Sequence, residues 1–502
     1  MNLFLVLYRR DLTREFAVEL GVMNFLFVFR SGFTSLRYAL MDTQNRMTIY
    51  YSKNRTDVTT AQRDTTLVTG YFSLPTELVQ EMLESSADEL AIDIDETRLA
   101  VTLDPNNFIS GKETMRLNAI LQPLLESESF EADKPTAAGA IAAGAEDPDA
   151  LPRGSVPLRA IAMLLLQSVR GRVNLDYTSP WKSSLSIKLW FWAAALGCAL
   201  PLVVRYCFYS APEDIDWTYV FTLFTICVCT MAHLQVVASL VAVAIYGMYR
   251  QAILAKHMVM LICPSSAVME PVTLDVFRVH WWGGQLQWKG KWIEERSAGT
   301  PIVDVGRCDN VNAWFKLRQL VLNFGLKFQI RTSLICGAAL ALAVGLFASE
   351  VWTLYRWRNI DEADADDHDI QQFIHMTAFS TVYTLSAFLS MIILIILGDI
   401  VNQSPVWCRG LLLNQSVELW HRWFADAEVT AGGEAAKTSR RLELMATERH
   451  IVAVGKYLEI HDHLFPIRLL GIRASRALIL SLAFGFVSTL GFAVNVVTYE
   501  ID

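Results

Sequence analysis

Residues 469–502, LLGIRASRALILSLAFGFVSTLGFAVNVVTYEID, contain an apolar helix of membrane length, with small and polar residues spaced along it. Five of these residues recur at helical spacing and share one face: Ser481, Gly485, Ser488, Phe492 and Asn495. A helix that serves only as a lipid anchor needs no such face. The stretch therefore predicts a helix that lines a hydrated path or packs closely against other helices, and the sequence leaves both readings open.

The rest of the chain is also apolar. It is 53% hydrophobic over 502 residues, its mean hydropathy is +0.31, and the excess lies after residue 186. Five segments are long and apolar enough to cross a bilayer: 187–209, 217–249, 332–355, 372–402 and 474–499. We therefore expect an integral, multi-pass protein of the plasma membrane, with the lipid bilayer as a partner.

The charges of the loops predict its orientation. Loops 210–216 and 357–371 are acidic, whereas loops 250–331 and 403–473 are rich in Lys and Arg. The positive-inside rule places the two basic loops and the N-terminal region in the cytoplasm, and the C-terminus outside. Helical patterns in the basic loops extend the spans into a cytoplasmic helical anchor, which gives five crossings with N-in and C-out topology.

Residues 1–134 read as a soluble α+β domain. Strand-like runs are expected at 25–29, 47–52, 66–72, 89–94 and 98–103, and helices at 75–84 and 111–126. Residues 135–155 are rich in Ala, Gly and Pro, so 135–186 are interpreted as a linker and juxtamembrane segment, and 187–502 as the transmembrane domain. The fold class is thus an all-α polytopic membrane protein with an N-terminal soluble domain.

The end of the chain resembles a known family. An amphipathic helix, the stretch LFPIRLLGIRASRALILSL (464–482) and a final helix are similar to the end of the insect gustatory and odorant receptor superfamily and its gustatory-receptor-like relatives. That family carries TYhhhhhQF in its last helix, where h is hydrophobic. In STLGFAVNV (488–496) the matching positions are Ser488, Thr489, Asn495 and Val496, each a related but different residue. The resemblance covers residues 187–502, although the family has seven spans and five are predicted here.

This resemblance implies a chemoreceptor that acts as a ligand-gated cation channel, opened by a small molecule. It implies a homotetramer in which the last helix lines the pore and the cytoplasmic helices hold the tetramer together. Candidate ligand or gating residues are polar groups in the predicted spans: His233, Gln235, Glu350 and His375. Hydrogen bonding between helices is the alternative for the two histidines, and Glu350 and Asp399 are expected to be solvated at the membrane surfaces.

A second resemblance concerns the N-terminal domain. FSLPTELVQEMLESSADELAIDIDETRLAVTL (72–103), a helix begun by proline and followed by two strands, is similar to half of a DNA sliding clamp, particularly of the checkpoint clamp family. This resemblance leaves open whether residues 1–134 are a true domain of the protein or come from a fused gene model.

Other function classes find no support in the residues. The chain has no phosphate-binding loop, nucleophile elbow, zinc-protease motif or paired CxxC, so we expect no enzyme activity, cofactor or metal. A net charge of −8 argues against a nucleic-acid partner. The rival to a channel is a non-conducting membrane scaffold or signalling protein whose N-terminal cytoplasmic domain binds a partner.

Overall fold

The computed structural model describes about half of the chain. The described residues are 153–172, 217–263, 302–323, 367–428, 434–464, 466–469 and 472–498, most of 80–102, and single helical positions within 20–31, 117–122 and 337–348. These residues are mostly helical, which confirms the helical character of the expected fold.

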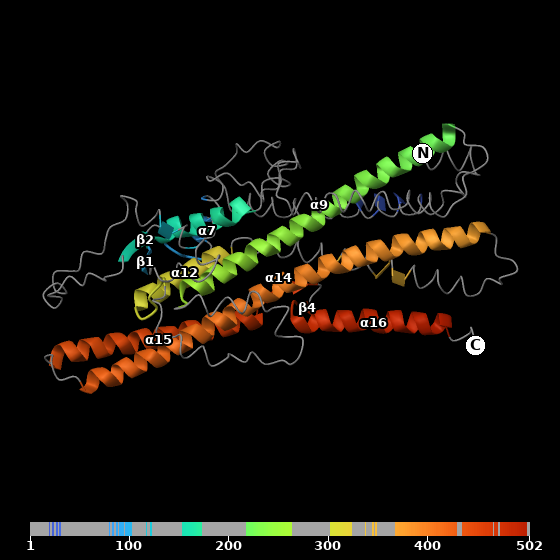
Figure 1. Ribbon diagram of the computed structural model, residues 1–502. Helices are drawn as coiled ribbons and strands as arrows, with labels where there is room; N and C mark the ends of the chain where they lie inside the picture. Colours follow the sequence, from blue (N-terminus) through green and yellow to red (C-terminus); the bar gives the residue numbers. More distant parts are fainter. Residues whose placement is uncertain are drawn as a thin grey trace.

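Two long helices run side by side through the molecule (Figure 1). Helix α9 spans Trp217–Leu261, and helix α14 spans Asp367–Glu428, continuing as one element past Pro405. Helix α15 (Glu434–Leu464) folds back along the end of α14, and α16 (Arg476–Thr498) lies beside the other half of α14 (Figure 1). The bundle therefore has one end built from several helices and another that extends along α9, α14 and α16.

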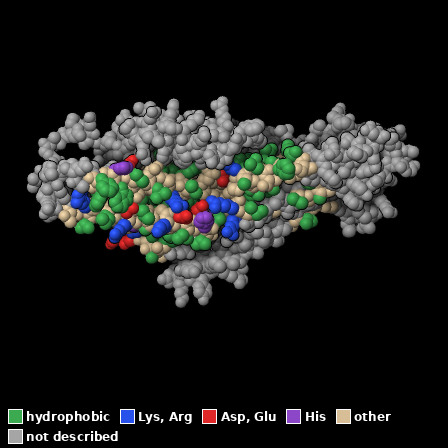
Figure 2. All heavy atoms as spheres, turned by 90° about the horizontal axis from the view of Figure 1, so that it is seen from below, with side chains coloured by type: hydrophobic (Ala, Val, Ile, Leu, Met, Phe, Trp, Pro, Cys, Tyr) green, Lys and Arg blue, Asp and Glu red, His purple; other side chains and the backbone are tan. Residues whose placement is uncertain are grey.

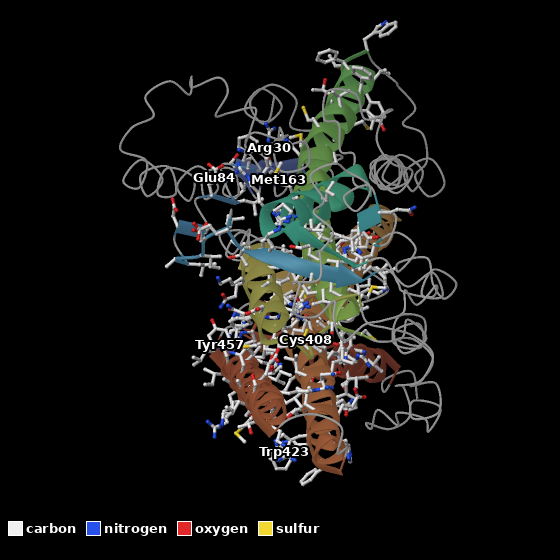
Figure 3. All side chains as sticks on the ribbon, turned by 90° about the vertical axis from the view of Figure 1, so that its left-hand side faces the viewer. Arg30, Glu84, Met163, Cys408, Trp423 and Tyr457 are labelled. Carbon is white, nitrogen blue, oxygen red and sulfur yellow. The ribbon has the colours of Figure 1, made fainter. Side chains whose placement is uncertain are left out.

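The end formed by several helices holds a continuous hydrophobic core. Helix α12 (Cys308–Asn323) contributes the fully buried Trp314, whose indole Nε1 donates a hydrogen bond to the Met258 carbonyl of α9 at 3.0 Å. Viewed along the bundle, Cys408 lies between the helices, with Tyr457 and Trp423 near the margins (Figure 3). Described buried residues within 83–101, 156–166, 253–263, 302–321, 408–419 and 451–458, together with Leu117 and Leu121, contribute to this core.

A two-stranded sheet lies against the bundle. Strand β1 (Arg98–Thr102) pairs antiparallel with β2 (Arg153–Pro157) and leads through β2 into helix α7 (Leu158–Arg172). Alternate β1 residues are buried in the core, and the amide of Ala100 donates to Asn310 Oδ1 of α12 at 3.2 Å. The strand expected at 98–103 is confirmed, while β2 and α7 occupy part of the range interpreted as a linker.

Two other strand predictions are wrong. Within 25–29 the described positions are helical, and residues 90–94 form a turn that closes a helix, with Ala91 at a φ of 51°. The amides of Leu90 and Ile92 both donate to the Ala87 carbonyl, and the turn buries Ile92 and Ile94. This alternation of buried residues imitates a strand in the sequence. The expected strands at 47–52 and 66–72 lie outside the described residues.

The predicted helices in the same region hold where they are described. The described positions of the helix predicted at 75–84 are helical, namely Gln80, Leu83 and Glu84. The described positions of the helix predicted at 111–126, which are 117, 121 and 122, are helical too.

The described residues contain one candidate membrane span instead of five, and it overlaps the predicted span 372–402 over 388–402 and continues into the loop predicted to be cytoplasmic. Phe388–His421 of α14 is long and apolar enough to cross a membrane, whereas Trp217–Thr230 of α9 and Arg476–Gly485 of α16 are apolar but shorter. Predicted span 187–209 lies outside the described residues, and span 332–355 is described at a few helical positions. Charged side chains gather over the α15 end and the middle of the face in Figure 2, while the described surface towards the other end shows hydrophobic side chains and few charges.

His461 near the end of α15 is a titratable group in the bundle. Its ring is tilted against Tyr457, with the ring centroids 6.1 Å apart. Burial lowers the pKa of His461 below its ordinary value of 6.5, the positive charge of Arg318 lowers this pKa further, and Asp462 opposes the shift. His461 is therefore neutral in the folded protein at neutral pH.

Acidification should destabilise the bundle through His461. Because the pKa of this group is lower in the folded than in the unfolded chain, the unfolded chain takes up the proton first, and stability falls as the pH drops below 6.5. Thermal unfolding in detergent at about pH 8 and about pH 5.5 tests this expectation. The variant His461→Gln should lose less stability on acidification than the parent, and an equal loss in both would contradict it.

Candidate functional site

The connection between α15 and α16 is a short hairpin held against both long helices. Strand β3 (Arg468–Leu469) pairs with β4 (Ile472–Arg473), and the amide of Ala474 donates to the Ile467 carbonyl at 3.0 Å. Eight buried residues surround this point: Ala244 and Met248 of α9, Met391, Leu394 and Ile395 of α14, and Ile467, Leu469 and Ala474 of the hairpin. We call this place the junction, because α16 begins here.

Asn402 of α14 is the polar centre of the junction. Its side chain is 4% exposed and bonds to both ends of the hairpin. Nδ2 donates to the carbonyls of Ile467 at 3.1 Å and Ala474 at 2.9 Å, and Oδ1 accepts from the Ile467 amide at 2.7 Å. One amide thus bonds to three buried backbone groups, and for the Ile467 amide and the Ala474 carbonyl the loss of this bond would cost about 1–3 kcal/mol each, while the Ile467 carbonyl also accepts from the Ala474 amide. The hairpin therefore cannot leave α14 without exposing these groups.

Gly398 lets the backbone of α14 approach the hairpin. A Cβ atom at this position would lie 2.8 Å from the Ala474 Cβ, and 3.4 Å from Met248 Cε. The first distance is shorter than van der Waals contact allows, so the absent side chain of Gly398 is what permits this packing.

Two ion pairs flank the hairpin. Asp399 Oδ2 of α14 accepts from Arg476 Nε at 3.1 Å and from Gln403 Nε2 at 2.6 Å, and Asp462 of α15 accepts from Arg473 Nη2 at 2.7 Å. Asp399 is 7% exposed, so the expectation that it is solvated at the membrane surface is wrong. The carboxylate is buried because Arg476 and Gln403 compensate it, and it fixes the first turn of α16 to α14.

Beyond the junction, α16 packs on one side. Leu478, Ile479 and Leu482 lie against the junction cluster, while Ser481, Gly485 and Ser488 are exposed. The same open side carries Leu480, Phe484 and Val487, which are 58–75% exposed. The hydroxyl of Ser481 donates to its own helix at the Ala477 carbonyl, 2.9 Å away. The small residues singled out in the sequence thus lie together on a face that other described residues leave uncovered.

His233 of α9 has a partner that the sequence reading missed. Arg30 Nη1 lies 3.1 Å from His233 Nδ1, and the Phe27 ring meets the imidazole edge-on at 5.6 Å. Since a guanidinium only donates, Nδ1 accepts and the imidazole proton is on Nε2. His233 therefore bonds between helical segments 203 residues apart.

The other predicted site residues are described less fully. Gln235 and His375 belong to α9 and α14, and Phe492, Thr489, Asn495 and Val496 belong to α16, but their side chains lie outside the described part. Glu350 lies outside the described residues altogether.

Some signals in the sequence could have pointed to the junction. Residues 398–403 read GDIVNQ, with polar groups at positions i and i+4 inside an otherwise apolar helix. Such groups must meet partners when the helix is buried. The identity of those partners depends on contacts 65 to 77 residues away, which no local pattern contains.

Among the residues that the structure describes, no group of three or more His, Cys, Asp or Glu side chains is placed to hold a metal ion. In comparisons with protein-family models, with curated proteins and with solved structures, nothing matched this chain. What the site can do is therefore argued from its own residues.

Replacing Asn402 by Leu should release the hairpin. The change removes all three bonds to buried backbone groups, so the free energy of unfolding should fall by about 2–4 kcal/mol. Thermal unfolding of the purified chain measures this loss, and limited proteolysis should cut earlier between residues 465 and 476. Asn414→Leu, at a half-buried position of the same helix, is the matched control and should change stability by less than about 0.5 kcal/mol. Similar losses in the two variants would contradict the assigned role of Asn402.

Gly398→Ala should disturb the same place by steric conflict. The added methyl group meets the Ala474 Cβ, so α16 must shift, at a cost of about 1–3 kcal/mol. Gly410→Ala is the control in the same helix, because a Cβ there would meet nothing within 4 Å. Gly410→Ala should be neutral or slightly stabilising, since alanine favours helix. A larger loss at position 410 than at 398 would show that α14 does not contact the hairpin in this way.

Proposed function

We propose that this chain is a polytopic membrane protein with the architecture of the gustatory-receptor-like superfamily, and that it works as a ligand-gated cation channel in which copies of α16 surround a central path. The proposal includes the five crossings expected from the sequence, with loops 250–331 and 403–473 in the cytoplasm and residue 502 outside. One observation carries it, namely the one-sided packing of α16 beyond the junction.

The open face of α16 supports assembly around an axis. A helix that contacted only lipid on that side would gain nothing from Ser481, Gly485 and Ser488, whereas small residues allow close approach and hydroxyl groups can face water. The large residues Leu480, Phe484 and Val487 lie beside them and could face lipid or a neighbouring copy. A mixed surface of this kind fits a helix set between a lipid boundary and a polar path.

The end of α14 that packs against α15 supports the same assembly. Six exposed positions follow one another at alternating intervals of four and three residues: Val406, Gly410, Leu413, Val417, Trp420 and Phe424. We call these positions the α14 seam. Alternating spacing of four and three is the pattern by which helices pair along a seam, and the five large residues are 44–58% exposed. The seam is therefore suited to contact with another helix, here that of a second copy.

The junction gives the proposed channel a route for gating. Any movement of α15 and the cytoplasmic end of α14 reaches the start of α16 through Asn402 and the Asp399–Arg476 pair. The small-molecule ligand would change the position of α9 relative to α14, and the junction would transmit that change to α16.

Cross-linking between copies tests the proposal first. Ser488→Cys, on the open face of α16, should form disulfide-linked oligomers in membranes under mild oxidation. Leu482→Cys, on the side that packs against the junction cluster, should behave like the parent chain. Particles of the purified full chain in nanodiscs should show fourfold symmetry in cryo-EM class averages.

The second measurement tests conduction. Rubidium-ion flux into liposomes containing the full chain should exceed that into empty liposomes, and Asn495→Leu should change it. A monomeric particle without cross-linking at position 488 would overturn the channel and favour a non-conducting membrane scaffold. An oligomer that shows no flux in any condition would support the proposed assembly of copies and would contradict conduction.

A further inference from the structure

A helical segment near the start of the chain lies along α9. Its described positions are Leu20, Met23, Asn24, Phe27, Val28, Arg30 and Ser31. Leu20 and Met23 are buried against Ile226, with Tyr219, Leu223 and Cys229 packed around them. Dark blue turns of ribbon beside the first half of α9 mark this segment in Figure 1.

The contacts fix the direction of the segment. Leu20 and Met23 meet α9 around residue 226, and Arg30 meets it at His233, so both chains advance the same way. The segment is therefore parallel to α9, and its amino-terminal side lies towards Trp217.

This half of α9 is apolar. Trp217–Thr230 contains no charged residue, and Trp217, Phe221, Phe224 and Val228 are 50–84% exposed on its surface. The neighbouring segment adds Phe27 and Val28, which are 53% and 67% exposed. Because Phe27 meets His233, the exposed apolar side chains of the segment extend the apolar surface of α9 past Val228.

The charged group of Arg30 points towards α9. Its guanidinium donates to His233, which lies midway along the span predicted at 217–249, and Arg30 itself is half-buried. An arginine at that depth of a bilayer is costly unless it is paired with a partner inside the protein, and such pairs mark places where helices must stay together.

We propose that residues 20–31 belong to a further membrane-embedded helix, parallel to α9 and bonded to it through Arg30 and His233. Lipid acyl chains cover its exposed side, including Phe27 and Val28. The proposal rests on the proposed function in one respect, because it requires α9 to cross the membrane. It adds a sixth crossing to the five of the proposed function and places the chain just before residue 20 on the outer side, whereas the loop charges predict an N-in arrangement.

Epitope accessibility tests this topology in the full chain. An epitope inserted after Arg10 should bind antibody on intact cells, because ten residues are too few to cross a bilayer before the helix begins. An epitope inserted after Ala431, between α14 and α15, is the cytoplasmic control and should bind only after permeabilisation. Binding of both epitopes only after permeabilisation would overturn the proposal. Release of the whole protein by alkaline carbonate would instead overturn the membrane function on which it rests.

A pair of variants tests the Arg30–His233 contact. His233→Leu removes the acceptor of the hydrogen bond from the Arg30 guanidinium. The guanidinium then lies at the depth of the membrane without this acceptor, so the thermal unfolding midpoint in detergent micelles should fall. Arg30→Leu combined with His233→Leu removes the charge as well, and the midpoint should recover most of that loss. Equal midpoints for the single and double variants would show that the pair does not join the two helices.

Discussion

The hydrogen bonds of Asn402 are the constraint on which the arrangement of the molecule depends. An amide buried in the middle of α14 can be satisfied only by fixed partners, and here those partners are the two ends of the hairpin before α16. Gly398 and Asp399 act at the same place by different means, one by leaving room and the other by charge. Shape, hydrogen bonding and charge thus specify one position of α16 relative to α14.

The described part of the region interpreted as a separate N-terminal domain shares its core with the long helices. Leu99 and Val101 of β1, and Leu158 and Ile161 of α7, are buried in the same cluster as Trp314 of α12 and Leu254 of α9. The sheet is two strands wide and gains stability by packing on helices, since an isolated pair of strands is marginal in water. Residues before and after the first predicted spans therefore build one hydrophobic core, and the clamp resemblance receives no support from this small sheet.

Sequence patterns predicted the features that depend on composition along a single element. The apolar length of α14, the helical nature of 474–499 and the shared face of Ser481, Gly485 and Ser488 all follow from hydropathy and spacing. Ile92 and Ile94 misled the reading because alternate burial arose from a turn, and the helical positions near Phe27 were mistaken for a strand in an apolar run. The partners of Asn402, Asp399 and His233 could not be predicted from the sequence, because tertiary packing brings each partner from 65 or more residues away.

The unbroken length of α14 has a mechanical meaning. At 1.5 Å per residue its 62 residues form a rod of about 93 Å, and Asn402 stands somewhat past its midpoint. This rod passes the junction near its middle, and it packs against α9 and, beyond the junction, against α15. A displacement at either end of α14 is therefore transmitted along one continuous helix to the junction, where α16 begins.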